Sequence, residues 1–352
     1  MIKGDCAVRI LLSGASGRVG TNLTKELLAR GHQVRGMVFP GDPKADKLDA
    51  FNIEVANVGL DDTEGIAQAA EGVDAVVHTA CVMSRPPTME KFTYYDINTT
   101  GTMRLLQAVA EQGDRLHRFV HISSDTVYPM PSLLYAPVDE QHPRLPIKEY
   151  GMIKVLNEEM VEHYRREYGL KTTIIRPGAI LAGEEIFNGW TAGIAAQQYR
   201  EASVARRGPL WHPEMAENAA KLDEAVKQRT DDPSKLLVNY YDRDGNPWLW
   251  HRTDARDVVH GIIQALEEDG AVGETLNMHG PYAIAFSEGT AVLSDLLGLP
   301  VLDWEAPACW QYWADNSAAK SRVKYAPQHD FQRMVADAVA LREGKETTVI
   351  PV

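Results

Sequence analysis

Tyr150 and Lys154 lie four residues apart, a spacing that places both side chains on one face of a helix. A lysine ammonium beside a phenol favours the phenolate, so we expect Lys154 to lower the pKa of Tyr150 from its ordinary value of about 10. A phenol with such a pKa can give and take a proton near neutral pH. The same spacing occurs by chance in many helices, so its meaning depends on the surrounding elements.

A pair of serines, Ser123 and Ser124, closes a β-prone run that starts at residue 119. Serines after a strand are most often turn residues. The segment after Tyr150 has apolar residues at helical spacing and a stop at Gly169, which predicts a helix that presents Tyr150 and Lys154 together. A hydroxyl, a phenol and an ammonium from neighbouring elements form a set able to polarise a substrate oxygen.

Three glycines, Gly14, Gly17 and Gly20, separate a β-prone run at 8–12 from a helical pattern at 21–30. Glycines let the backbone approach a pyrophosphate closely, and the free N–H groups and dipole of a helix start favour its negative charge. We therefore predict a dinucleotide phosphate site at this turn. The alternative is a tight strand-to-helix turn that binds no ligand.

Strand and helix patterns alternate through the first half of the chain. Further strands are predicted at 32–39, 52–58, 73–78, 119–124 and 172–176, with helices at 61–71, 98–112 and 150–168. Such repeats predict an α/β fold with a doubly wound parallel sheet of Rossmann type, whose ligand crevice lies beyond the strand C-termini. We assign residues 1–180 to a dinucleotide-binding domain, with a returning strand near 274–280. Residues 181–352 are assigned mostly to a smaller, mixed substrate-binding region.

Several short motifs occur in order along this first half. They are the glycine turn, the segment starting at His78, Asn98-x-x-Gly101-Thr102, Ser123-Ser124-x-x-Val127-Tyr128, Tyr150-x-x-x-Lys154 and Arg176-Pro177. Because these motifs occur in this order, the chain resembles the extended short-chain dehydrogenase/reductase family, also called the NAD-dependent epimerase/dehydratase family. The resemblance implies that Tyr150 is the general acid/base, that Lys154 also holds the nicotinamide ribose, and that Ser124 bonds the substrate oxygen.

The resemblance also implies a set of cofactor-binding residues. These are Gly14, Ser16, Gly17, Arg18, Val19, Gly20, Phe39, Leu60, His78, Thr79, Ala80, Tyr150, Lys154 and Pro177. Gly59 stands where relatives usually carry an aspartate near the adenine. Adenine recognition is therefore expected to rely on apolar contacts or on the backbone of Leu60.

The choice between NAD and NADP depends on the end of the second predicted strand. NADP-selective relatives often carry an arginine where this chain has Phe39, and its absence favours NAD. The acid that usually binds the adenosine ribose is also missing there, and Asp42 comes late. Arg18, Lys44 or Lys47 would be able to reach a 2′-phosphate, so NADP stays open.

Three residues of these motifs have structural interpretations as well. For His78 we favour a hydrogen-bonded, half-buried histidine over a catalytic one. For Cys81 we favour a small packing residue, because no base that would activate a nucleophile is identifiable. Asn98 either ties neighbouring strands together through hydrogen bonds or caps its helix.

Two departures from the family pattern bear on the reaction. Relatives that dehydrate sugar nucleotides carry a glutamate where this chain has Thr126, and elimination needs that base. Sugar-nucleotide enzymes often have an asparagine directly after the position of Pro177, where this chain has Gly178. We therefore predict an NAD(P)-dependent oxidoreductase acting on a secondary alcohol or ketone of a sugar, sugar acid or polyol-like molecule. A sugar or sugar-nucleotide epimerase with tightly bound NAD is the alternative, and a non-catalytic dinucleotide sensor is a third hypothesis.

Candidate substrate residues come from both halves of the chain. Asp125 and Thr126 follow Ser124, although Asp125 is equally well a turn former. Arg252 and Arg256 suit a carboxylate or phosphate of the substrate, or else they are solvated surface arginines. In the same segment, Asp257 is predicted to cap the following helix.

The second half of the chain carries all seven tryptophans, between Trp190 and Trp313. Aromatic faces suit sugar C–H surfaces and flat rings, so this region is expected to shape the substrate pocket, although any single tryptophan more often packs a core. An amphipathic helix is predicted at 212–229, and the segment 212–234 is a lid, an interface arm or an ornament. A helix is also predicted at 330–342.

The bulk composition limits the partners. The net charge is −13, from 36 Lys+Arg against 49 Asp+Glu, and no basic run is present, which argues against nucleic acids and anionic membranes. Three dispersed cysteines argue against a disulfide framework or a zinc site, and no metal is predicted. No signal-peptide or spanning apolar stretch is evident, so a cytoplasmic enzyme is expected. The family resemblance suggests a homodimer through the helices at 98–112 and 150–168.

Overall fold

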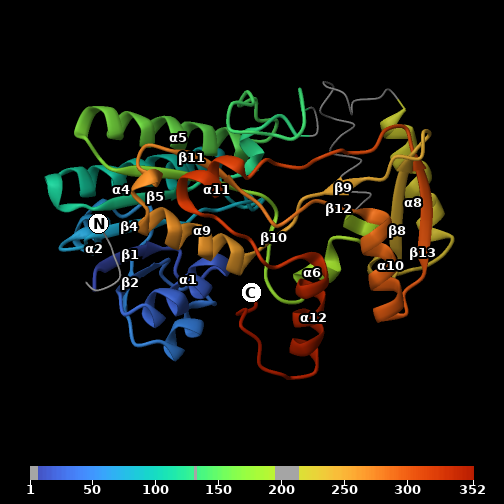
Figure 1. Cartoon of the computed structure of the whole chain (residues 1–352), viewed down its shortest axis with the longest axis horizontal. Coiled ribbons are helices and arrows are strands. Elements are labelled where there is room, and N and C mark those ends of the chain that lie inside the picture. Colours follow the sequence, from blue (N-terminus) through green and yellow to red (C-terminus); the bar gives the residue numbers. More distant parts are fainter. Residues whose placement is uncertain (1–6, 131–132, 195–213) are drawn as a thin grey trace.

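The computed structural model describes residues 7–130, 133–194 and 214–352. Its largest element is a seven-stranded sheet ordered β11-β6-β5-β4-β1-β2-β3, in which every pair of neighbours is parallel (Figure 1). The strands are β1 (Arg9–Ser13), β2 (Gln33–Val38), β3 (Glu54–Asn57), β4 (Ala75–His78), β5 (Arg118–Ile122), β6 (Thr172–Pro177) and β11 (Thr275–Met278). The strand order reverses at β1, which is the arrangement of a doubly wound sheet. The predicted fold class is confirmed.

Helices cover both faces of this sheet, and the central strands β4, β5 and β6 are therefore buried along their whole length. One face packs against α1 (Arg18–Ala29), α9 (Ala255–Glu267) and α11 (Ser317–Val323). The other face packs against α2 (Thr63–Ala70), α4 (Gly101–Ala110) and α5 (Glu149–Tyr168). Because parallel strands end at one edge, this layering brings the ends of β1, β4, β5 and β6 together.

A short irregular stretch leads into α4. It consists of α3 (Lys91–Tyr95) and one π-helical turn (Asp96–Thr100). Within that turn, the Asn98 side chain accepts a hydrogen bond from the Val82 N–H at 2.8 Å and donates to the Val82 and Tyr94 carbonyls at 3.2 and 3.0 Å. Asn98 therefore ties the segment after β4 to the helices instead of capping a helix end.

The remaining elements form a smaller mixed region with its own apolar core. Its strand pairs are β8 (Leu237–Asp242) with β13 (Val301–Ala306), β9 (Leu249–Trp250) with β12 (Ile284–Ala285), and β7 (Ile180–Leu181) with β10 (Thr253–Asp254). Its helices are α6 (Glu185–Asn188), α8 (Met215–Lys227), α10 (Phe286–Leu297) and α12 (Phe331–Arg342). Trp190, Trp248 and Phe286 pack in this core, so several tryptophans serve packing.

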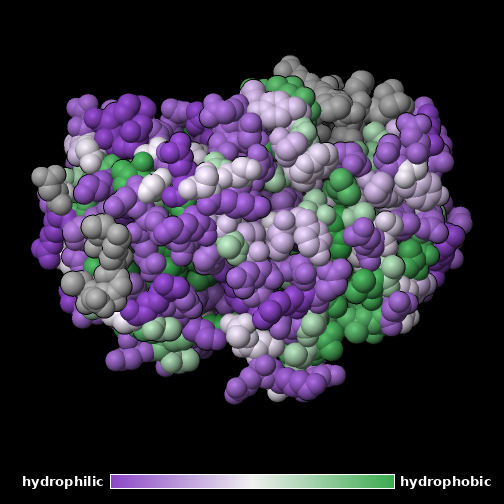
Figure 2. Space-filling model, in the orientation of Figure 1, coloured by the Kyte–Doolittle hydropathy of each residue, from purple (hydrophilic) through white to green (hydrophobic). Residues whose placement is uncertain are grey.

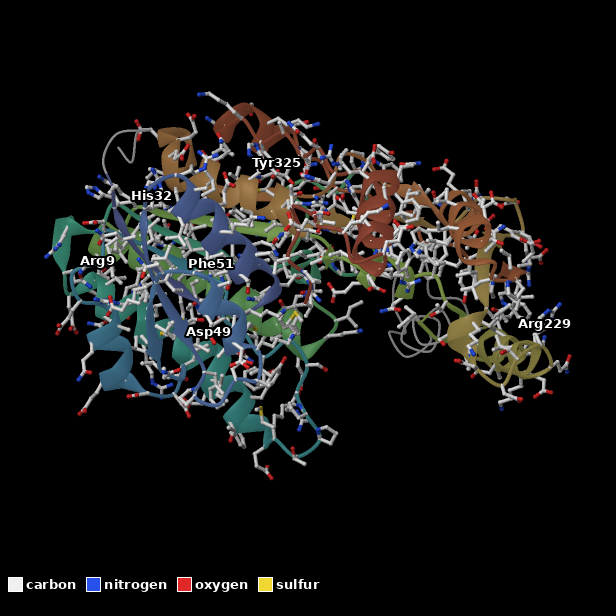
Figure 3. The ribbon with its side chains drawn as sticks, turned by 90° about the horizontal axis from the view of Figure 1, so that it is seen from below. Arg9, His32, Asp49, Phe51, Arg229 and Tyr325 are labelled. Atoms are coloured by element: carbon white, nitrogen blue, oxygen red, sulfur yellow. The ribbon has the colours of Figure 1, made fainter. Side chains whose placement is uncertain are left out.

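The two regions lie at opposite ends of the long axis of the molecule. Figure 3 shows Asp49 and Phe51 beside the first sheet and Arg229 at the far end of the smaller region. Figure 2 shows a mainly hydrophilic face, with hydrophobic residues gathered toward the smaller region near α10. None of the described helices is both long and apolar enough to cross a membrane.

Several local predictions can be compared with the structure. The predicted returning strand is β11, which pairs with β6, and the helix predicted at 330–342 is α12. The helix predicted at 212–229 is α8, although residues 212 and 213 lie outside the described residues. The cap of α9 was assigned to the wrong aspartate, because Asp254 accepts the Arg256 N–H at 2.8 Å whereas Asp257 bonds the backbone of Gln328 and His329. The domain boundary near residue 180 and the homodimer stay predictions.

Candidate active site

The glycine turn lies between the end of β1 and the start of α1. Gly14 has a φ of +73°, and a Cβ atom on it would lie 2.9 Å from the backbone of Ala80. A Cβ atom on Gly20 would lie 2.1 Å from the Gly14 carbonyl oxygen, so only glycine lets α1 start this close to the turn. Gly17 is the N-cap of α1 and supplies no capping side chain, which leaves the N–H groups of the first turn open to a ligand. These residues fit the pyrophosphate of a dinucleotide.

A cavity of about 720 Å³ extends from this turn to the ends of β4, β5 and β6, a volume that suits a bound small molecule. It is lined by nearly all of the predicted cofactor-binding residues, namely Gly14, Ser16, Gly17, Arg18, Val19, Gly20, Phe39, Leu60, Thr79, Ala80, Tyr150, Lys154 and Pro177. Ser124, Asp125 and Thr126 line it as well. The fold therefore gathers the phosphate turn and the candidate catalytic residues around one space.

His78 is the predicted cofactor residue that does not line the cavity. Its ring nitrogens bond the hydroxyls of Ser13 at 2.7 Å and Thr102 at 3.0 Å, and it is buried. Burial, assisted by the charge of Lys154, lowers the pKa of His78 to about 3. It is thus a neutral histidine that links β1, β4 and α4. This position corrects the predicted cofactor contact and agrees with the structural role that we favoured.

Although the sequence has no acid directly after the second strand, an acidic residue lies beside the glycine turn in the cavity wall. Asp42 lines the cavity, where its carboxylate accepts hydrogen bonds from the Ser16 hydroxyl at 2.5 Å and the Lys44 N–H at 3.0 Å. Against the effect of burial, these bonds lower the pKa of Asp42. The loop after β2 thus folds back and brings a late acid beside the glycine turn. Sequence spacing alone did not indicate this position.

Two of the three cations expected to reach a 2′-phosphate bind other groups of the protein. Arg18 forms an ion pair with Glu185, and Lys47 donates to the Pro351 carbonyl at 2.8 Å. Lys44 lines the cavity as well. Its backbone N–H bonds the Asp42 carboxylate, so the negative charge of Asp42 lies beside it. This arrangement favours NAD over NADP, because a phosphate next to Asp42 would meet a like charge.

Replacing Asp42 with alanine should therefore relax the cofactor preference. We expect the ratio of the NADPH to the NADH dissociation constants to fall about ten-fold, since one repulsive charge is removed from the phosphate position. Fluorescence titration with each nucleotide measures both constants. Asp49→Ala, an exposed change on the 3₁₀ turn η1 (Ala45–Ala50), is the matched control. An unchanged ratio in Asp42→Ala would show that Asp42 does not select the cofactor.

The candidate catalytic residues come from the end of β5 and from α5. The Ser124 hydroxyl accepts the Thr126 N–H at 3.1 Å, which fixes it at the start of the 3₁₀ turn η4 (Asp125–Val127), and it also bonds Tyr150. Lys154 is buried, donates to the Ile122 carbonyl at 2.8 Å, and its ammonium lies 5.6 Å from the centre of the Tyr150 ring. The predicted trio is thus assembled in one wall of the cavity.

The pKa of Tyr150 is shifted in the direction opposite to the prediction. Burial raises it well above its ordinary value, and nearby Cys81, Asp125 and Tyr94 add to the rise, while the bond from Ser124 opposes it. Lys154 bonds Cys81 and the Ile122 carbonyl and does not offset the loss of hydration. The Cys81 thiol also has a raised pKa because of burial, which suits the packing role predicted for it.

Asp125 is a buried carboxylate at the substrate end of the cavity. It is bonded by the Ser124 hydroxyl at 3.2 Å and by the Tyr312 hydroxyl at 3.1 Å, and Tyr312 lies 3.4 Å from His279 Nε2. Burial raises the pKa of Asp125 to about 6, although both hydroxyls and the charge of Arg252 oppose the shift. Asp125 therefore joins Ser124 to Tyr312 of the smaller region.

The two predicted substrate arginines differ in their surroundings. Arg256 is engaged by Asp254 at 2.7 Å and by Asp337 at 2.6 Å and does not line the cavity. Arg252 is buried with its guanidinium over the ring of Trp250, 2.8 Å from the ring centre. Its Nε and Nη2 atoms have no hydrogen-bond partner among the described residues. Of these two arginines, only Arg252 has unpaired donors among the described residues, and neither arginine lines the cavity.

Several wall residues were not identified as site residues from the sequence. They are Asp42, Met130, Trp250, Trp310 and Val352. The clustering of tryptophans in the second half was the one signal that pointed to two of them. The other contacts depend on loops and on chain segments far apart in the sequence, which residue spacing does not report.

With this geometry in place, comparison with known proteins identifies the family. The model of the family described as "NAD dependent epimerase/dehydratase family" matches residues 10–278. The chain belongs to this family. The resemblance inferred from the motifs is confirmed, and so is NAD as the cofactor at the level of the family.

A solved structure agrees with this assignment. A short-chain dehydrogenase/reductase superfamily protein from Agrobacterium tumefaciens, with bound NAD, is 26% identical, with a TM-score of 0.79 over 96% of this chain and 97% of that chain. UDP-glucuronic acid 4-epimerase from Bacillus cereus is 21% identical, with a TM-score of 0.69 over 96% of this chain and 100% of that chain, and supports the fold alone.

Curated relatives carry different names. Sterol demethylase protein B of Methylococcus capsulatus is 33% identical over 49% of this chain and 51% of its own length. The uncharacterized UDP-glucose epimerase YtcB of Bacillus subtilis is 24% identical over 95% of this chain and 97% of its own length. A 3-beta-hydroxysteroid dehydrogenase of Mycolicibacterium neoaurum is 32% identical over 49% of this chain and 47% of its own length. With several of the best-matching curated relatives, the match thus spans only about half of the relative's length.

Proposed function

We propose that the protein is an NAD-dependent oxidoreductase that transfers a hydride between the cofactor and a secondary alcohol or ketone of a polar small molecule. The observation that carries this proposal is the meeting of Ser124, Tyr150 and Lys154 in the same cavity as the glycine turn. NAD, when bound, supplies the hydride acceptor or donor. The residues of the chain bind it, orient the substrate and move the proton.

Each catalytic residue has a distinct task in this proposal. Tyr150 takes the proton of the alcohol during oxidation and returns it during reduction. Ser124 donates a hydrogen bond to the substrate oxygen and stabilises the negative charge that develops there. Lys154 donates to the Ile122 carbonyl, and its ammonium lies 5.6 Å from the centre of the Tyr150 ring. From this position it would hold the nicotinamide ribose.

The substrate end of the cavity supports a polar substrate with apolar ring faces. Trp250, Trp310 and Met130 supply flat or apolar contacts, while Asp125 supplies a hydrogen-bond acceptor. The Thr126 hydroxyl and the Trp310 ring nitrogen are buried without partners among the described residues, as are the Arg252 atoms. Buried polar atoms cost free energy unless a ligand bonds them. Arg252 does not line the cavity, but its guanidinium lies over the ring of Trp250, which does, so among sugars, polyols and sugar acids we expect its positive charge to favour an acid.

A sugar or sugar-nucleotide epimerase is the alternative function. The full-length relative named as a UDP-glucose epimerase favours it. Against it stands Gly178 in place of an asparagine, whereas Thr126 in place of a glutamate disfavours only dehydration. An epimerase would keep its NAD through turnover and produce no net NADH.

A substrate panel tests the proposal. The purified protein is mixed with NAD and matched pairs of sugar acids and neutral sugars, polyols and steroid alcohols, and NADH absorbance is followed. We expect net NADH formation with a polar secondary alcohol and a larger kcat/KM for the acid of a pair. Protein that arrives with NAD bound and interconverts sugar epimers without net NADH would favour the epimerase. Turnover of steroid alcohols alone would overturn the polar-substrate assignment.

A further inference from the structure

The last segment of the chain returns from α12 to the mouth of the cofactor cavity. Figure 1 shows the C-terminal end beside α1, between the helices of the first sheet and α12. Residues 348–352 run alongside α1, and Val352 lines the same cavity as Arg18, Asp42 and Lys44. We name residues 348–352 the strap. The family model ends at residue 278, so the family match does not account for the strap.

The strap is fixed by side chains from the dinucleotide-binding region. The buried Asn22 side chain of α1 bonds both backbone polar groups of Ile350. It accepts the Ile350 N–H at 2.8 Å and donates to the Ile350 carbonyl at 2.9 Å. Lys25 donates to the Thr348 carbonyl at 3.2 Å. Such paired backbone bonds resemble one rung of a β-ladder and hold the strap in one register.

Two further contacts connect the strap to neighbouring segments. Lys47, from the 3₁₀ turn after β2, donates to the Pro351 carbonyl at 2.8 Å. Arg256 of α9 donates to the Thr348 hydroxyl at 2.7 Å. Val349 is buried against Ala182 and Ala255. The strap thus joins α1, α9 and the 3₁₀ turn η1, which follows Asp42 in the chain.

We infer that the strap is part of the NAD site and slows the release of the cofactor. Val352 lines the cavity, and the neighbouring Pro351 is bonded by Lys47, whose charge interacts with those of Arg18, Asp42 and Lys44. The strap thus lies on the side of the cavity where the adenosine and phosphate groups of bound NAD are expected. A dinucleotide leaving past this wall meets the strap. Release is faster when the bonds of Asn22 to Ile350 break, because local opening precedes ligand exit.

Two variants test the strap independently of any substrate. One ends the chain after Thr347, and the other is Asn22→Ala, which keeps the strap but removes its paired bonds. NADH is bound to each, and its dissociation rate is measured by stopped-flow fluorescence after displacement with excess NAD. Asn239→Ala, which removes an amide that bonds Asp303 on β13, is the matched control.

We expect the dissociation rate of NADH to rise about ten-fold in the shortened chain and several-fold in Asn22→Ala, as two or three hydrogen bonds are lost. The Asn239→Ala rate should equal that of the parent protein. The unfolding temperature of the NADH-free shortened chain and of Asn22→Ala should fall, because buried Val349 or the bonds of Asn22 are lost, while both variants stay folded at the temperature of the rate measurement. A rate within about two-fold of the parent value in Asn22→Ala overturns the inference. If the shortened chain does not fold, Asn22→Ala alone decides. Because no substrate is used, failure of this test leaves the proposed reaction unaffected.

Discussion

Replacing Tyr150 with phenylalanine is expected to reduce kcat by about 10²- to 10⁴-fold, the contribution of a positioned general acid/base. The ring and its packing remain, while the proton acceptor is lost. NADH formation with the substrate found in the panel measures the effect, and fluorescence titration should give an unchanged dissociation constant for NADH. Tyr164→Phe is the matched control, because it removes a hydroxyl that lies about four turns further along α5 and bonds Gln107 of α4.

The pH dependence should follow from the raised pKa of Tyr150. Since burial favours the protonated phenol, the phenolate is scarce at neutral pH in the cofactor-free protein, and alcohol oxidation should speed up as the pH rises. Ketone reduction, which uses the phenol, should slow over the same range. A Tyr150→Phe variant that keeps its activity within about ten-fold, with the same pH profile, would remove Tyr150 from the proton-transfer role.

Replacing Glu158 with glutamine should destabilise the protein by about 3–5 kcal/mol, the cost of leaving one member of a buried ion pair without its partner. Glu158 and Arg176 are both buried and meet through two hydrogen bonds, at 2.7 and 2.9 Å. The same carboxylate accepts the Ser123 hydroxyl at 2.6 Å. Urea unfolding followed by circular dichroism measures the free energy of unfolding.

Glu159→Gln is the matched control for this prediction. Glu159 is the next residue on α5, is exposed, and among the described residues pairs with Arg144, which also reaches Glu158; its replacement should cost about 0–1 kcal/mol. Equal losses in the two variants would contradict a special role of the buried pair. The pair also connects the end of β5 to α5 and β6 beside the site, because Ser123 directly follows β5, Glu158 belongs to α5 and Arg176 to β6.

The pH dependence of this stability has a definite sign. Although burial acts to raise the pKa of Glu158, the hydrogen bonds and charge of Arg176 outweigh it and lower the pKa below its ordinary value. A lowered pKa gives stability that is present above the unfolded value of about 4.3 and is lost as the pH falls through the lower folded value. The unfolding free energy of Glu158→Gln should therefore vary less with pH in this acidic window than that of the parent protein.

Local sequence patterns predicted most of the first sheet because each of its elements carries its own signal. The runs that became β4 and β5 are apolar and bounded by turns, and the glycine turn precedes a helix that Gly31 ends. The spacing of Tyr150 and Lys154 predicted that both side chains lie on one face of a helix. In contrast, the cap of α9 was misassigned, because two aspartates three residues apart are equally good caps until their partners are known.

The sequence by itself determined the doubly wound fold, the phosphate turn and the identity of Ser124, Tyr150 and Lys154 as the candidate proton-transfer set. Only the tertiary structure decided that Asp42 folds back to Ser16, that Asp125 meets Tyr312, and that residues 348–352 lie against α1 with Val352 in the cavity wall. It also reversed the expected pKa shift of Tyr150. The physical reason is the same in each case: hydration and the nearest charges depend on which distant segments pack together, and residue spacing carries no record of that packing.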